Sequence, residues 1–563
     1  MANPRPQRSY STPNLLSRLE SSTESQANEQ KTLSVEQNLS RSNSRDILMS
    51  SSLLFSSHRS NITRSSSPFF TTKVSPENLP IPNLPVLDAI YDSVQNKEHT
   101  PNFENYVFVC GQHLLSTTVS LMKWIMDLGG KGENIFIVGK SYSNNSEVID
   151  WLNKLGIQHT PTSEQDALGK FVDAYEDDVR DMWTKASDRM RKLSYLEGVI
   201  VLDDGGHVLA KMPKKTRKIS KFVIGIEQTS SGIASAQSTQ YSTIQVASSL
   251  IKGLVEPPMI AEIVADKLME KLSTIQEGQL ELDLTEKDQS EISRTKMVDY
   301  FAKKKSSDET ICYGIVGYGH IGQAVLMRLI ANGNKDFIIF DADNTKLASI
   351  HELEKAHNVT IVPIKELNNI NNADIIIGCT GKDITANKDE MFKAIRSPKI
   401  LISCSSKDSE FHTLLSYIQS AHRGITFNPL SDRLFKNGFG NPLLVVKGGM
   451  PINFDGSHRS VPVHDIQVIR GLKAQAILQG YEMIQAWRKA NDVPTPKSYK
   501  LTVKGQLEVF QEWIKDPKAT KKYWEPFKEM LTEDYISKHS VGDEYISSMP
   551  SAASTSAVSY RLR

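Results

Sequence analysis

The fold is decided by one stretch of the sequence, Ile311-Cys-Tyr-Gly-Ile-Val-Gly317-Tyr-Gly319-His-Ile-Gly322. Its apolar first half predicts a buried strand, and its second half is a G-x-G-x-x-G turn. A helix-like run follows over Gln323 to Ala331, and a second apolar strand, Phe337 to Phe340, ends in Asp341. Strand, glycine turn, helix, strand and acid in this order are typical of the βαβ unit that opens a Rossmann fold.

The glycine turn has a physical role in binding a dinucleotide. Gly317 permits the tight turn, Gly319 lets the backbone approach a pyrophosphate, and Gly322 lets the helix pack closely on the strand. The pyrophosphate would then lie at the helix N-terminus, beside His320 and Ile321, where unpaired N–H groups and the helix dipole favour negative charge. The turn therefore predicts a dinucleotide site.

Asp341 predicts which dinucleotide is bound. It lies about twenty residues beyond the glycines, where a carboxylate can accept from both ribose hydroxyls and so select NAD over NADP. The cofactor that we expect is NAD. The alternative is a Rossmann fold that has lost its ligand.

Bulk composition narrows the class of protein. The chain has 563 residues, enough for two or three domains, and its net charge of +1 gives no electrostatic case for nucleic acid or a membrane surface. No apolar run approaches the eighteen residues of a membrane span, and no secretion signal is recognisable. The four cysteines have no metal-ligand spacing and are expected to be free thiols in a reducing compartment, so we expect a cytoplasmic protein.

The chain divides into four parts by composition. Residues 1–85 form a Ser-rich arm with few aromatic residues, which is expected to be disordered and either binds a protein partner or is a featureless solvated arm. Strands and helices alternate over 86–289 and again over 290–450, which predicts an α/β fold of two doubly wound, Rossmann-like parallel sheets. Residues 455–500 are expected to complete the first domain, and 501–563 form a helical segment with a frayed tail.

Several short sequence motifs occur one after another along the globular part of the chain. They are Leu202-Asp-Asp-Gly-Gly206, Glu227-Gln-Thr-Ser-Ser-Gly232, Gly317-Tyr-Gly-His-Ile-Gly322, Cys379-Thr-Gly381, Asp432-Arg433, Lys436-Asn-Gly438 and Asn453. They resemble the L-D-D-G-G, E-E-T-T-T-G, G-Y-G-D-V-G, T-T-G-C and D-R…K-N-G…V-N segments of the S-adenosylhomocysteine hydrolase family. The resemblance covers about residues 105 to 490.

The resemblance implies a chemistry and a set of roles. Enzymes of this family use NAD⁺ to oxidise the 3′-hydroxyl of the substrate ribose, eliminate homocysteine, add water and reduce the ketone again. By resemblance, His113 is a candidate general acid/base, and Asp204 and Gln228 contact the substrate ribose. The cofactor-binding positions implied in the same way are Thr229, Ser230, Ser231, Gly317, Gly319, His320, Ile321, Gly322, Asp341, Cys379, Thr380, Gly381 and Asn453. The family also implies a homo-oligomer.

The sequence departs from the family at the catalytic set. Gln228 replaces a glutamate, and an amide keeps hydrogen bonding but loses the charge. Ser406 stands where the family has a histidine. The K-S-K-F-D-N motif is absent, so that ungapped counting puts Glu270 at the place of the catalytic lysine, whereas a one-residue gap puts Lys271 there. These changes argue against efficient hydrolysis, because losses within one cooperating set cost orders of magnitude.

Three functions remain open from the sequence. The first is a divergent S-adenosylhomocysteine hydrolase-like protein or a relative that acts on another nucleoside, with His113, Asp204 and Lys271 as catalytic candidates. The second is a catalytically weak, NAD-holding protein that regulates partners through its Ser-rich arm. The third is a 2-hydroxy-acid-type dehydrogenase, which would leave the matches in the first domain unexplained. For His113 itself, the alternative is a capping or core histidine, and for Asp204 an ordinary turn after a strand.

Overall fold

The computed structural model describes residues 81–95, 100–160, 171–237, 239–280, 287–348, 350–386, 395–405, 408–421, 431–437, 439–493 and 495–539. The predicted arm therefore lies almost wholly outside the described residues, as do Ser406 and the end of the tail. The described chain forms two seven-stranded sheets flanked by helices, so the predicted α/β class with two doubly wound sheets is confirmed.

The first sheet is entirely parallel, in the order β14-β6-β5-β4-β1-β2-β3. Because both faces of a parallel sheet are covered, its central strands are continuous apolar runs. Its strands are β1 (Tyr106–Gly111), β2 (Ile135–Val138), β3 (Gln158–Thr160), β4 (Gly198–Asp203), β5 (Val223–Glu227), β6 (Ser242–Gln245) and β14 (Ser498–Lys500).

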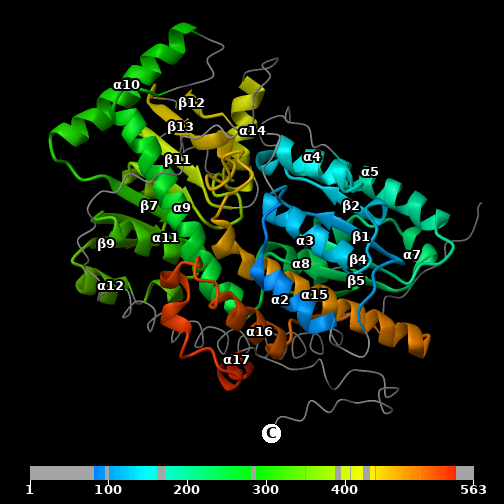
Figure 1. Ribbon diagram of the computed structural model, residues 1–563. Coiled ribbons are helices and arrows are strands. Elements are labelled where there is room, and N and C mark those ends of the chain that lie inside the picture. The colour runs from blue at the N-terminus through cyan, green and yellow to red at the C-terminus, as the bar shows by residue number, and fades with distance from the viewer. Residues whose placement is uncertain are drawn as a thin grey trace, which may run out of the picture. The chain divides into compact units, whose positions relative to one another are not determined.

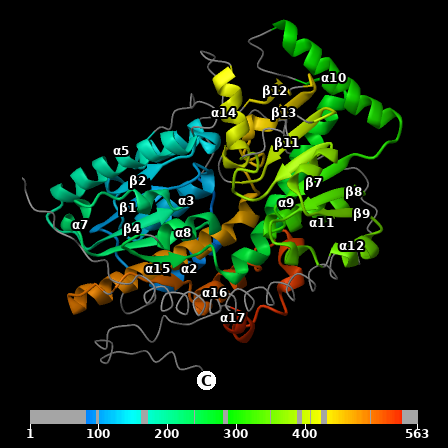
Figure 2. The same ribbon diagram turned by 180° about the vertical axis from the view of Figure 1, so that it is seen from behind.

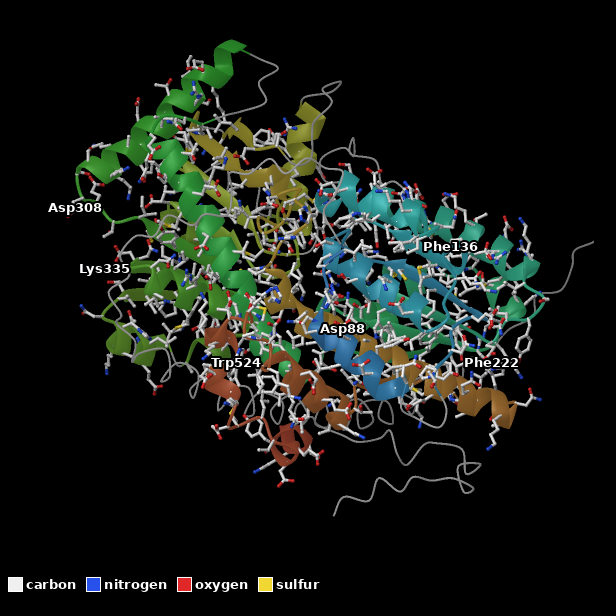
Figure 3. The ribbon with its side chains drawn as sticks, in the orientation of Figure 1. Asp88, Phe136, Phe222, Asp308, Lys335 and Trp524 are labelled. Atoms are coloured by element: carbon white, nitrogen blue, oxygen red, sulfur yellow. The ribbon has the colours of Figure 1, made fainter. Side chains whose placement is uncertain are left out.

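Helices cover both faces of this sheet. Buried side chains of α5 pack on one face, against Val107, Val109 and Phe136, and Figure 3 labels Phe136 within this domain. On the other face, α2, α3 and α15 lie side by side, as Figure 1 shows. The helices of this part are α2 (Pro85–Gln95), α3 (Ser116–Asp127), α4 (Ser146–Lys154), α5 (Phe171–Lys192), α6 (His207–Ala210), α7 (Thr216–Ile219), α8 (Ser230–Gln237), α15 (Val463–Ala490), α16 (Val503–Trp513) and α17 (Glu533–His539).

The second sheet has the order β12-β13-β11-β10-β7-β8-β9, and β12 alone is antiparallel to its neighbour. Figure 2 shows β7, β8 and β9 side by side. Its strands are β7 (Cys312–Val316), β8 (Asp336–Phe340), β9 (Thr360–Ile364), β10 (Ile375–Gly378), β11 (Lys399–Ser403), β12 (Arg433–Lys436) and β13 (Pro442–Val445).

The second sheet is also covered on both faces. One face packs on α9 (Leu250–Gln276), α10 (Lys287–Ser306) and α11 (His320–Ala331). The other face packs on α14 (His412–Ala421) and on neighbouring loops, and α12 (Ile350–His357) lies beside β9. The two sheets differ at one edge, because β13, the last strand of the second sheet, lies between β11 and β12. In both sheets the first strand lies next to the fourth, and the strand order reverses at that pair. Ligands of such sheets bind beyond the carboxyl ends of these two strands, where the strand order reverses.

Among the described residues, no helix is long and apolar enough to cross a membrane.

Candidate functional site

The glycine turn of the second sheet has the geometry that a pyrophosphate needs. Gly317 has a φ of 97°, which favours glycine, and a Cβ on Gly322 would lie 2.0 Å from the carbonyl oxygen of Gly317. A Cβ on Gly319, by contrast, would meet nothing within 4 Å. Two of the glycines are therefore needed for the turn and its close packing, and the third keeps a space open beside the helix N-terminus.

The helix α11 begins at His320, so that the predicted residues His320, Ile321 and Gly322 form its first turn. Burial, together with the nearby lysines Lys346 and Lys252, lowers the pKa of His320. The unpaired N–H groups and the dipole of this helix N-terminus suit an anionic pyrophosphate.

Asp341 lies directly after β8, at the place where the sequence predicts the ribose acceptor. Its Oδ2 accepts from the backbone N–H of Tyr318 at 2.7 Å, and its Oδ1 accepts from the N–H of Asp343 at 2.8 Å. Lys346 forms an ion pair with the same carboxylate at 3.2 Å. The carboxylate therefore ties the end of β8 to the glycine turn.

The turn after β10 carries Cys379, Thr380 and Gly381 beside this glycine turn, since a Cβ on Gly317 would come within 3.0 Å of both Cys379 and Thr380. The buried carboxylate of Glu410 holds the turn, because it accepts from the backbone N–H groups of Thr380 and Gly381, each at 2.6 Å. Burial raises the pKa of Glu410 to about 7. These contacts fix the turn in place.

The first sheet brings His113 and Asp204 together at its own reversal point. His113 follows β1 and Asp204 follows β4, and these strands are neighbours in the sheet. The His113 Nε2 lies 3.6 Å from Asp204 Oδ2, and the Lys140 Nζ lies 2.9 Å from Asp204 Oδ1. Burial alone would raise the pKa of Asp204, but the nearby charges, Lys140 first, outweigh it and hold that pKa well below its usual range. Asp204 is therefore an ionised, buried acceptor.

Hydrogen bonds orient the imidazole of His113. The Ser143 hydroxyl donates to the carbonyl of Lys140 at 3.1 Å, so its oxygen accepts from His113 Nδ1, 2.8 Å away. This leaves Nε2 of His113 as the acceptor nitrogen, facing Asp204. Burial, and then Lys140, lowers the pKa of His113 well below its ordinary value, so the ring is neutral.

A single segment after β13 connects the two sites. Ile452 packs in the core of the second sheet, and Ser403 on that sheet accepts from its backbone N–H at 3.1 Å. Two residues further on, the ring of Phe454 stacks on His113 with centroids 4.2 Å apart. Asn453, the predicted cofactor residue, lies between them and is buried. The substrate-type and dinucleotide-type sites are thus joined through three consecutive residues.

Gln228 and the hydroxyl residues after it lie at the end of β5. The Gln228 amide donates to Asp204 Oδ2 at 3.0 Å. Thr229 donates through its backbone and its hydroxyl to Glu227, both at 2.7 Å, while Ser230 and Ser231 are exposed at the start of α8. The structure brings Gln228 to the His113 site, and it ties Thr229 to a neighbouring carboxylate.

Lys271 is placed differently from His113 and Asp204. It lies near the end of α9 and pairs with Asp432, at 2.7 Å. Another pair on the same helix, Lys252 and Glu256, was not singled out from the sequence; the two are in contact in the first turns of α9. Lys271 is nineteen residues beyond Lys252, which is about 28 Å along the helix axis at 1.5 Å per residue.

Sequence reasoning also missed three buried cations around Asp204. Lys140, Arg470 and Lys473 are each at most 4% exposed. Lys473 donates to the side-chain oxygen of Gln112, the residue before His113. The i, i+4 spacing of Lys252 and Glu256 could have revealed that pair, but no spacing in the sequence marks these three cations as neighbours of Asp204.

Comparison with known proteins supports the dinucleotide site. The family model described as "NADP oxidoreductase coenzyme F420-dependent" matches residues 312–407, which include the glycine turn, Asp341 and the turn after β10. The matched segment is therefore similar to the Rossmann fold of dinucleotide-binding oxidoreductases, and the open space at Gly319 fits such a cofactor.

Two curated relatives come from Mycobacterium tuberculosis. They are "Uncharacterized protein MT0113" of strain CDC 1551 / Oshkosh and "Uncharacterized protein Rv0104" of strain ATCC 25618 / H37Rv, each 27% identical over 386 residues. The match covers 67% of this chain and 64% of each relative's length.

A solved structure of a 2-hydroxyacid dehydrogenase from Ketogulonicigenium vulgare Y25 is similar over 70% of this chain and 98% of its own, with 10% identity and a TM-score of 0.32. At that TM-score the likeness carries no conclusion about this chain.

Proposed function

We propose that this chain is an NAD(P)-dependent oxidoreductase of the S-adenosylhomocysteine hydrolase type, acting on a hydroxyl of a small nucleoside-like substrate. One observation carries the proposal: a neutral histidine and an ionised aspartate face each other at the reversal point of the first sheet, and Phe454, next to the predicted cofactor residue Asn453, stacks on that histidine. The motifs quoted from the sequence support the same lineage.

The geometry supports a role for each residue. The 3.6 Å between His113 Nε2 and Asp204 Oδ2 is too long for a direct hydrogen bond, and both atoms are acceptors. A substrate hydroxyl between them would donate its proton to one, and an adjacent hydroxyl could donate to the other. His113 would then remove a proton as general base, while Lys140 and Gln228 hold Asp204 in position.

The cofactor would supply hydride transfer, and the protein's contribution is position and acid–base groups. Gly317, Gly319 and the first turn of α11 would hold the pyrophosphate, and Asp341 the adenosine ribose. NAD is the form that Asp341 favours, and the test includes NADP as well. The turn at Cys379, Thr380 and Gly381, with Asn453, would border the nicotinamide half.

We further propose a cytoplasmic homo-oligomer. All four cysteines are free thiols, which suits a reducing compartment. The family resemblance supports the oligomer, and sedimentation of the purified chain would test it.

The experiment is an assay of the purified full chain with saturating NAD⁺ or NADP⁺ and either S-adenosylhomocysteine or adenosine. Reduced cofactor is followed by absorbance, and released homocysteine by thiol titration. Formation of reduced cofactor that disappears in His113→Ala, but not in the exposed-site control His351→Ala, supports the proposal. No reduced cofactor with either substrate, despite measured cofactor binding, contradicts it. Homocysteine release that is lost on Lys271→Ala would additionally assign the catalytic lysine to Lys271.

A further inference from the structure

The first domain holds two buried cations that have neutral partners. Arg470 and Lys473 lie three residues apart on one face of α15, and they are 4% and 2% exposed. Arg470 Nε donates to the Thr117 hydroxyl at 3.0 Å, and Lys473 Nζ donates to the Gln112 side-chain oxygen. Among the described residues, neither cation forms an ion pair with a carboxylate.

The carboxylates closest to them are already engaged. Asp204 pairs with Lys140, and Glu256 pairs with Lys252, so each of these two ion pairs is neutral. Asp204, Lys252 and Glu256 act electrostatically on Lys473, as does Arg470. When Arg470 and Lys473 are both protonated, the four basic groups and two carboxylates carry an excess of about two positive charges.

Two other buried carboxylates lie nearby and do not supply the missing charge. Asp203 accepts from the backbone N–H of Leu209 at 2.8 Å, and Glu227 accepts from Thr229 and Gly205. Burial raises the pKa of both carboxyls, and the charge of Asp203 raises the pKa of Glu227 further. They form a separate pair, and their hydrogen-bond partners lie in α6 and just before α6 and α8.

A like-charged buried pair is costly unless something compensates it. Removing a charge from water is unfavourable unless an opposite charge or hydrogen bonds compensate it. Two hydroxyls beside the cluster add to this. Ser116 precedes Thr117, the partner of Arg470, and Ser141 follows Lys140; the hydroxyls of both are buried without a hydrogen-bond partner among the described residues. Buried cations without a carboxylate partner are what an anionic group requires.

We propose that this site binds the phosphate group of a phosphorylated nucleoside, with Arg470 and Lys473 as its charged contacts. The inference rests on the proposed function, which places a nucleoside-like substrate at His113. A phosphomonoester carries about −1.5 to −2 charge at pH 7, which matches the excess of the cluster, whereas a single carboxylate would leave one cation unpaired. Arginine suits a phosphate because its planar fork donates to two oxygens at once.

The test measures binding by isothermal titration calorimetry on the full chain with saturating NAD⁺. The probes are adenosine 5′-monophosphate, adenosine and inorganic phosphate. The nucleotide is expected to bind at least about tenfold more tightly than adenosine, because close charge pairs across a binding interface are worth about that much at the lower end of their measured range. Inorganic phosphate is expected to compete with the nucleotide; if it binds equally tightly, free phosphate is the source of the group.

Two variants and a control separate ligand binding from structure. Lys473→Met and Arg470→Met are expected to lower nucleotide affinity about tenfold or more and leave adenosine affinity unchanged. Each is also expected to raise the melting temperature of the ligand-free protein, because a buried basic group without a carboxylate partner is replaced by an apolar side chain. Lys489→Met, at an exposed position on the same helix, should change neither property.

The proposal is overturned if adenosine binds as tightly as the nucleotide, if neither phosphate-bearing probe binds, or if the two variants lower the melting temperature and keep the nucleotide preference. Cofactor reduction is scored separately in the same samples. Phosphate-dependent binding without reduced cofactor would contradict the proposed function and support the phosphate site. Reduced cofactor without a preference for the nucleotide would support the proposed function and contradict the phosphate site.

Discussion

His113 Nε2 lies 3.6 Å from Asp204 Oδ2, although the two residues are 91 positions apart in the sequence and follow different strands. The adjacency of β1 and β4 creates this pair, because both strands end at the same edge of the sheet. A neutral imidazole beside an ionised carboxylate presents two acceptor atoms, which suit a donor group of a ligand.

Replacing His113 tests whether its imidazole acts as a general base. His113→Ala should lower turnover about a hundredfold to ten-thousandfold, because that is the usual contribution of a positioned general base. The affinity for the dinucleotide should not change, since the cofactor residues of the second sheet remain. Steady-state kinetics with a fluorescence titration of reduced cofactor would check both values. Full turnover in the variant would assign His113 to packing on Phe454 alone.

The stability of the ligand-free protein should depend on pH through Lys473. Burial first, and then Arg470, lowers its pKa well below 10.5, while Lys252 lowers it further and Asp204 and Glu256 raise it. Between the depressed pKa in the fold and the value of about 10.4 in the unfolded chain, the unfolded state binds more protons. Stability contributed by this group therefore rises with pH.

Denaturation at pH 7 and pH 9 would measure that slope. The wild-type protein should gain more stability over this interval than Lys473→Met does, whereas Lys489→Met should behave as the wild type. A saturating phosphate ligand should cancel the difference, because it restores the charged form of Lys473. An identical pH response in Lys473→Met would show that the lysine titrates as an ordinary exposed group does.

Much of the fold could be predicted from the sequence, because a strand that is buried on both faces is an apolar run in the sequence. The run Tyr106 to Cys110 is strand Tyr106–Gly111, and the predicted helix at Gln323 begins three residues earlier, at His320. The strand Ser498–Lys500 was not predicted. It has three residues and pairs with β6 more than 250 positions away, so it has neither length nor local pattern to mark it.

The site was predictable only where residues lie in a motif. The glycine turn and Asp341 have fixed spacing, and His113 and Asp204 came from a family resemblance. Arg470 and Lys473 lie in a helix whose basic residues resemble any solvated helical face. They are buried because α15 packs on α2, α3, α16 and the sheet at once, which is a property of the assembled fold. Burial of this kind has no signature in local sequence.

The glycine turn provides a matched pair of variants. Gly319→Ala adds a Cβ into open space, at a φ of −82° that alanine adopts readily, so folding should be unaffected. Gly322→Ala places its Cβ 2.0 Å from the Gly317 carbonyl and should destabilise the protein by about 1–3 kcal/mol, as overpacking does.

The variant that keeps its stability, Gly319→Ala, should be the one that loses cofactor affinity. Gly319→Ala should retain its melting temperature but lose about tenfold or more in dinucleotide affinity, because the space that it fills is the one a pyrophosphate approaches. Thermal denaturation and a titration with reduced cofactor give the two numbers. Unchanged affinity in Gly319→Ala would move the dinucleotide away from this turn.

Asp341 should decide between the two nicotinamide cofactors. Its carboxylate accepts from the backbone N–H of Tyr318 and pairs with Lys346, and it lies where the adenosine ribose is expected. Asp341→Asn keeps an oxygen for Tyr318 and removes the charge that would repel a 2′-phosphate. The preference for NAD over NADP should fall about tenfold or more, which corresponds to about 1.4 kcal/mol. Asp308→Asn, an exposed position labelled in Figure 3, is the matched control and should leave the preference unchanged. If the wild-type chain already prefers NADP, Lys346 rather than Asp341 governs the choice, and Lys346→Gln should then reverse it.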